Sequence, residues 1–155
     1  MKSVMIVKRL IALAQENVDI GGWPFSAIIT KNSEIVADAV NSVHKSNDPS
    51  DHAEVAAIRK ATAKLNSTDL SEYTVYMLAP PCPMCYTCMV LANVKQATYI
   101  LDADRKGRAL STLPPTLGLY KSIKKGFENG KVTFTRNESY SDIVYELMQK
   151  WDSFN

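Results

Sequence analysis

Long apolar runs are missing from this chain of 155 residues. Its apolar stretches are short, such as Met89–Ala92, whereas a membrane-spanning helix needs about 20 such residues. The amino terminus also lacks the pattern of a signal peptide, because Lys8 and Arg9 interrupt its apolar residues and no small-residue cleavage site follows. The sequence therefore predicts a cytoplasmic protein that does not enter a membrane.

Cysteine is scarce and unevenly distributed. The three cysteines, Cys82, Cys85 and Cys88, fall within seven positions. An odd, clustered set makes a poor disulfide framework and suits a metal or redox site in a reducing compartment. A chain of this length can bury on the order of 70% of its unfolded surface without a metal or a disulfide. We therefore expect one domain over residues 1–155, in which any metal serves chemistry.

The net charge of +2 is also small, but it hides an asymmetry along the chain. Residues 105–136 hold eight lysines or arginines and one acid, a balance of +7, which leaves ten basic and fifteen acidic residues elsewhere. Such a basic segment is either a phosphate-binding patch or a solvated face. We favour the solvated face, and nucleic-acid binding remains the alternative.

Hydrophobic spacing indicates alternating helices and strands. A helix is expected over residues 2–17, ended by Gly21 and Gly22. The following elements are expected to be strands 25–30 and 35–40, a helix starting at Asp48-Pro49 and running through 53–65, strand 73–78, helix 85–94, strand 98–101, strand 132–135 and helix 143–151. This order predicts an α/β sandwich whose later strands run parallel and are joined by helical crossovers.

Two short motifs stand 30 positions apart: His52-Ala53-Glu54 and Pro81-Cys82-Pro83-Met84-Cys85. One imidazole and two thiolates are the three protein ligands of a catalytic zinc site, which leaves the fourth position for water. If Cys82 caps a helix, both sulfurs lie near the positive end of its dipole, which lowers the thiol pKa. We expect one Zn²⁺ per chain on His52, Cys82 and Cys85, with a catalytic water whose pKa the metal lowers.

Glu54 is the candidate for moving protons between that water and the substrate. On a regular helix His52 and Glu54 would point roughly 200° apart, so they can share a site only at a helix amino terminus. Cys88 forms a second, overlapping C-x-x-C pair with Cys85. Because Cys88 would lie about 1.7 turns beyond Cys82, we interpret it as a small buried hydrophobic residue.

The pattern H-x-E followed by P-C-x-x-C resembles the zinc nucleobase deaminases of the cytidine deaminase-like superfamily. Over about residues 4–101 the chain is most similar to the small bacterial guanine deaminases. The segments that carry this resemblance are Pro24–Ala27, Asn41, Ser46–Pro49 and His52–Ala61. The resemblance implies a three-layer α/β/α fold around a mixed, mostly five-stranded sheet, a homodimer, zinc on the three ligands and Glu54 as proton shuttle.

The same resemblance implies contacts to the base. Asn41 would hydrogen-bond it, Phe25 would pack on it and the backbone at Ala53 would meet its edge, while Trp23 either lines the pocket mouth or covers the core. The chain departs from the pattern at Pro80, where relatives usually carry glutamate, and in 113–120, which offers no acidic residue. An acceptor for the ring N–H groups of guanine would then come from Glu138 or Asp142, within the chain or from a partner.

The favoured function is hydrolytic deamination of a free nucleobase, guanine to xanthine plus ammonia. A second hypothesis keeps the chemistry and changes the substrate to adenosine in tRNA, cytosine or another small amine. A third is a zinc-stapled interaction domain without catalysis, which a fourth protein ligand to the metal would support.

Overall fold

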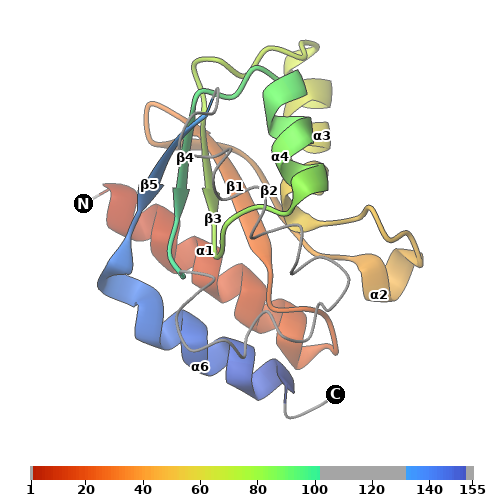
Figure 1. Cartoon of the computed structure of the whole chain (residues 1–155), viewed down its shortest axis with the longest axis vertical. Coiled ribbons are helices and arrows are strands. Elements are labelled where there is room, and N and C mark those ends of the chain that lie inside the picture. Colours follow the sequence, from red (N-terminus) through yellow and green to blue (C-terminus); the bar gives the residue numbers. More distant parts are fainter. Residues whose placement is uncertain (1, 102–131, 153–155) are drawn as a thin grey trace.

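The computed structural model describes residues 2–101 and 132–152, which build a mixed five-stranded sheet (Figure 1). Its strands lie in the order β2-β1-β3-β4-β5. Their bounds are β1 Ser26–Lys31, β2 Glu34–Val40, β3 Thr74–Met77, β4 Gln96–Tyr99 and β5 Thr133–Arg136. Strand β1 is antiparallel to β2 and β3, whereas β3, β4 and β5 run parallel. The predicted parallel arrangement of the later strands is confirmed.

Helices cover both faces of this sheet, which confirms the three-layer α/β/α prediction (Figure 1). The helices on one face are α1 Lys2–Asp19 and α6 Ser141–Asp152, and those on the other are α3 Ala53–Leu65 and α4 Pro83–Leu91. Two short elements complete the described parts, α2 Val43–Ser46 and the 3₁₀ helix η1 Glu138–Tyr140.

The alternation of side chains along the strands divides the core in two. In β1, Ala27 and Ile29 join the cluster under α3 and α4, and Ile28 joins the cluster under α1 and α6. The hairpin between β1 and β2 turns at Asn32 and Ser33, which both have a positive φ, as tight hairpin turns require. Both faces of β1, the second strand of the sheet, are thus buried.

Several element boundaries differ from the sequence predictions. Helix α3 begins at Ala53 rather than at Asp48-Pro49, because the Asp48 carboxylate accepts the Ser50 N–H and makes a turn there instead. Helix α4 begins at Pro83, two residues earlier than expected, and β4 is Gln96–Tyr99 rather than 98–101. The helix expected over 85–94 ends earlier, at Leu91, and Asn93 just beyond it has a positive φ that is not helical. The short helix α2 was not predicted.

None of the described helices combines the length and the apolar character that a membrane crossing requires. Most of the basic segment 105–136 and the whole of 113–120 lie outside the described residues, apart from the part that forms β5.

Candidate metal and substrate site

The two sequence motifs meet at the amino termini of α3 and α4. His52 is the residue that caps α3, and Cys82 caps α4 with Pro83 in the first turn. The Cys82 sulfur accepts the backbone N–H of Cys85 at 3.4 Å, so the cap predicted for this thiol is present. Because His52 stands just outside α3 and Glu54 in its first turn, both can face one site, which meets the condition derived from the sequence.

The three candidate metal ligands converge on one point. His52 Nδ1 lies 3.6 Å from Cys82 Sγ and 3.5 Å from Cys85 Sγ, and the two sulfurs are 3.3 Å apart. Tetrahedral zinc at its usual bond lengths separates such ligands by about 3.6 to 3.8 Å. The donor set and its spacing therefore fit zinc, and within residues 2–101 and 132–152 no fourth side chain joins the group. A closed structural site is not what these residues build.

Cys88 stands apart from this cluster. It is half-buried and packs against the core under α3 and α4, and burial raises the pKa of its thiol. Cys82 and Cys85 are thus the pair beside His52, as predicted, and Cys88 is a largely apolar packing residue that is less buried than expected.

The site polarises its own ligands. The hydrogen bond between the two cysteine side chains lowers the pKa of Cys82 to about 4, and His52 adds to this effect. Reciprocally, the hydrogen bond with Cys82 raises the pKa of His52. The contact with Cys82 and burial raise the pKa of Cys85. The Cys82 thiolate, the form that binds metal, is therefore stabilised by its neighbours.

Glu54 is placed beside the metal ligands without joining them. Its side chain is only 8% exposed, and its Oε2 accepts a hydrogen bond from Cys85 Sγ at 3.4 Å. Burial raises the pKa of this carboxyl group above its usual value. A carboxyl group shifted toward neutral pH can both accept and release a proton, which suits general acid–base chemistry.

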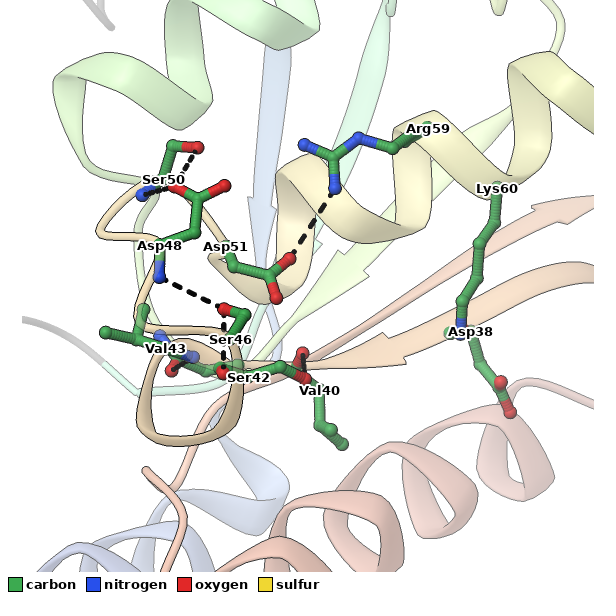
Figure 2. A network of polar contacts seen from close by, with 11 residues as sticks. Asp38, Val40, Ser42, Val43, Ser46, Asp48, Ser50, Asp51, Arg59 and Lys60 are labelled. Atoms are coloured by element: carbon green, nitrogen blue, oxygen red, sulfur yellow. Dashed lines mark hydrogen bonds and ion pairs between the residues drawn. The ribbon is translucent and has the colours of Figure 1, made fainter.

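The loop that delivers His52 is held by its own polar side chains (Figure 2). Asp48 Oδ1 accepts the backbone N–H of Ser50 at 2.8 Å and its hydroxyl at 2.7 Å. The Asp51 carbonyl accepts the N–H of Ser42 at 3.0 Å, and the Asp51 carboxylate pairs with Arg59 of α3 at 3.5 Å. These contacts hold the backbone that leads to His52 against β2 and α3.

A pocket opens beside the ligands and encloses about 370 Å³, counting its open mouth. The described residues that line it are Trp23, Phe25, Asn41, His52, Glu54, Ala79, Pro80 and Cys82. Two of the candidate metal ligands, His52 and Cys82, form one side of this pocket together with Glu54. Residues of the segments before β1, after β2 and after β3 form the other.

Three of the four predicted substrate contacts line the pocket. Asn41 is buried, and its Oδ1 accepts the N–H of Val43 at 3.2 Å, which leaves its amide N–H₂ as the group available to a ligand. Phe25 is half-buried, and Trp23 both lines the pocket and packs on Trp151 with ring centroids 5.8 Å apart. Ala53 is a fully buried residue at the start of α3 and is absent from the described lining.

Sequence reasoning missed two participants. Ala79 lines the pocket next to Pro80, and no motif distinguishes it. Asn17 lies under the pocket wall, where its side-chain amide contacts the backbone of two lining residues. A polar residue on the buried face of α1, in helical register with Leu10 and Ala14, is the signal that could have revealed it.

The acidic residues considered as base acceptors lie elsewhere. Glu138 is exposed at the start of η1 and pairs with Arg136 at 2.8 Å, and Asp142 is exposed in the first turn of α6. Neither residue is among the described residues that line the pocket. The suggestion that one of them accepts the ring N–H groups of guanine in the pocket of its own chain therefore gains no support.

Comparisons with known proteins agree with this site. The family described as the cytidine and deoxycytidylate deaminase zinc-binding region matches residues 2–101. A guanine deaminase of Bacillus subtilis (strain 168) is 38% identical over 129 residues, which covers 83% of this chain and 81% of the relative. A tRNA-specific adenosine deaminase of Aquifex aeolicus (strain VF5) is 36% identical over 91 residues, which covers 59% and 60% of the two chains.

A solved structure leads to the same family. The X-ray structure of guanine deaminase from Bacillus subtilis superposes with a TM-score of 0.70 at 33% identity, covering all of this chain and 96% of the other. Since the match extends over the motifs that bring His52, Cys82 and Cys85 together, this chain belongs to the cytidine and deoxycytidylate deaminase zinc-binding family.

Proposed function

We propose that this protein catalyses the zinc-dependent hydrolytic deamination of guanine to xanthine and ammonia. The observation that carries the proposal is a three-ligand metal cluster that opens, beside a buried Glu54, onto a pocket lined by Asn41 and two aromatic residues. The substrate follows from the similarity over most of the chain to a relative named guanine deaminase.

The residues divide the chemistry between them. Zinc held by His52, Cys82 and Cys85 would supply a Lewis acid that activates water for attack on the amine-bearing carbon, C2 of guanine. Glu54 takes a proton from the attacking water as the new carbon–oxygen bond forms. It delivers this proton to the adjacent ring nitrogen, and then carries a second proton from the new hydroxyl group to the amine, so that the carbonyl forms, the carbon–nitrogen bond breaks and ammonia leaves. Its position beside Cys85 puts the carboxyl group within the same small space as the metal ligands.

The opposite wall orients the base. The side-chain oxygen of Asn41, Oδ1, accepts the Val43 N–H. The side-chain amide of Asn41 can therefore donate its N–H groups to an acceptor on the base, a ring nitrogen or a carbonyl oxygen. Phe25 and Trp23 supply apolar surface for the flat ring. Ala53 is proposed to meet the base edge through its backbone, since it stands between two lining residues.

We further propose that the protein works as a homodimer. Helix α4 carries no charged residue, and one face of it, Met84, Thr87, Cys88 and Leu91, follows helical spacing and reaches the surface. Leu91 is 79% exposed and Met84 37%. A helix that is apolar on both sides is normally covered. Leu91→Glu is expected to dissociate the dimer, measured by light scattering coupled to size-exclusion chromatography, and an unchanged mass would contradict this interface.

We propose a cytoplasmic location because the thiols of Cys82 and Cys85 must stay reduced to bind zinc. Expression as a fluorescent fusion and fractionation of the cells would test this. Recovery in an oxidising compartment would contradict it.

The substrate is tested by incubating zinc-loaded protein with guanine, adenine, cytosine and a tRNA anticodon stem-loop while ammonia is measured. We expect release with guanine at a kcat/KM at least about tenfold above any other substrate, which corresponds to about 1.4 kcal/mol of discrimination. Release from the stem-loop alone would favour the function named for the Aquifex relative. Silence with every substrate would contradict the proposal.

A further inference from the structure

One buried side chain outside the catalytic cluster connects the residues of the base-facing wall. Asn17, in the last turn of α1, is 2% exposed. Its Nδ2 donates to the carbonyl oxygen of Trp23 at 2.8 Å and to that of Asn41 at 2.9 Å. A single amide group therefore joins the segment before β1 to the segment after β2.

These contacts close a ring of hydrogen bonds under the pocket. The Trp23 carbonyl also accepts the N–H of Phe25 at 2.8 Å, and the Phe25 carbonyl accepts the N–H of Asn41 at 3.0 Å. The Asn41 carbonyl then returns to Asn17. All three side chains proposed to touch the base belong to residues of this ring, and Asn17 is its one side-chain member.

The sequence around Asn17 leaves space for this amide and for little else. The Asn17 carbonyl accepts the N–H of Gly22 at 2.7 Å. A Cβ atom added to Gly22 would lie 2.5 Å from Asn17 Nδ2 and 2.6 Å from both Cγ and Oδ1. Non-bonded heavy atoms do not approach so closely, so the absence of a side chain at position 22 is what admits the amide.

Asn17 is a polar residue on a face of α1 that is otherwise apolar, and its side-chain N–H groups donate to the backbone of the pocket segments. The orientation of the amide is fixed, because a flipped group would point its oxygen at two carbonyl oxygens. The two hydrogen bonds therefore align two backbone segments that carry pocket residues.

We propose that Asn17 is a positioning residue that sets the base-facing wall, so that Trp23, Phe25 and Asn41 meet the base in register. The inference rests on the proposed function, since it concerns the affinity for the base. Asn17 touches neither the metal ligands nor Glu54 in any described contact, so its removal is expected to spare the zinc cluster.

The first test compares Asn17→Ala with Ser141→Ala. Ser141 is a matched control because its buried hydroxyl donates to the Ile100 carbonyl at 3.2 Å and makes no described hydrogen bond to a residue of the ring. Asn17→Ala should raise KM for guanine about tenfold, with zinc content unchanged and kcat altered less than KM. Both variants should lower Tm, because each leaves a buried carbonyl oxygen without its donor, but Ser141→Ala should leave KM unchanged. An unchanged KM in Asn17→Ala, or an equal rise in both variants, would overturn the proposal.

The second test uses the close approach at position 22. Gly22→Ala should raise KM much as Asn17→Ala does, because the new Cβ displaces the amide. In the double variant Asn17→Ala/Gly22→Ala the clashing atoms are gone, so the second substitution should add little. Fully additive effects would show that Gly22 acts independently of the amide and would contradict the ring.

A readout that needs no substrate separates this inference from the proposed function. Amide hydrogen exchange at Phe25 and Asn41 should accelerate in Asn17→Ala relative to Ser141→Ala, since the wall loses its link to α1. If guanine is not deaminated by the unmodified protein but this acceleration is seen, the proposed function fails and the positioning role of Asn17 stands. If guanine is deaminated and neither exchange nor KM changes in Asn17→Ala, the proposed function stands and the positioning role fails.

Discussion

The two sides of the pocket are built in different ways. The metal side is made of side chains at two helix amino termini, and each helix contributes its residues from a stretch of four positions or fewer. The base side is made of residues from three separate segments. Hydrogen bonds that include the remote amide of Asn17 link the backbones of two of them, the segment before β1 and the segment after β2. On the proposed function, we therefore expect the reaction type to depend on residues that are close in sequence, and the fit of the base to depend on how distant segments are joined.

The largest expected effect comes from removing a metal ligand. Cys85→Ala should lose zinc and reduce turnover to background, because two protein donors cannot replace a three-donor site. Cys88→Ala is the matched control, since it removes a thiol of the same helix that lies outside the cluster. Zinc content by atomic emission should remain at one per chain in the control, and its loss there would show that the wrong pair was assigned.

The next effect sharpens the same side. Glu54→Gln should keep zinc and lower kcat by about 10² to 10⁴, because an amide of the same shape cannot take the proton from water. Glu54→Ala should behave alike, with zinc retained. Metal analysis and steady-state kinetics on one preparation would decide it, and a variant that had lost its zinc would assign Glu54 a ligand role instead.

On the base side we expect a smaller loss of activity, seen in KM rather than in kcat. Asn41→Ala should raise KM for guanine about tenfold or more, because a buried hydrogen bond to the base is lost. Zinc content should not change, since Asn41 has no described contact with the ligands. A fall in kcat with KM unchanged would place Asn41 in the reaction itself and would weaken the division between the two sides.

The smallest effect concerns the loop before His52. Asp48→Ala removes two hydrogen bonds to Ser50 and should weaken zinc binding by about tenfold or less, because the imidazole is less ordered before binding. Asp69→Ala is the control: its carboxylate accepts the Ser71 N–H in a similar turn at 3.0 Å but precedes no ligand. Zinc affinity measured by competition with a chelator should fall only in the first variant, and an equal fall in both would refute the role of the loop.

What the sequence revealed follows this division. His52, Glu54, Cys82 and Cys85 were found because zinc chemistry requires those residue types at short spacing beside a helix start, and the structure brings them together. The parallel arrangement of the later strands followed from the order of predicted helices and strands along the chain, and the five-stranded sheet was implied by the family resemblance. Boundaries were less well predicted, because the turn at Asp48 and the positive φ at Asn93 depend on local hydrogen bonds and backbone geometry that hydrophobic spacing does not report.

Three lining residues of the base-facing wall, Trp23, Phe25 and Asn41, were named from the sequence, but the hydrogen bonds that join them through Asn17 were not, and the reason is physical. Asn17 acts on carbonyl groups, which every residue has, so nothing in Trp23 or Asn41 identifies the partner that holds them. Gly22 looks like an ordinary helix end, and its second role appears only from the approach of the amide. Such long-range contacts follow no fixed spacing in the sequence. The one indication was a polar residue, Asn17, on the otherwise apolar face of α1.

The most direct measurement titrates zinc into metal-free protein while the conversion of guanine to xanthine is followed. The account predicts no conversion without metal, a linear rise with added zinc and a plateau at one equivalent per chain, as three ligands at a single open site require. Conversion of guanine by metal-free protein, or no conversion by protein fully loaded with zinc, would contradict the account.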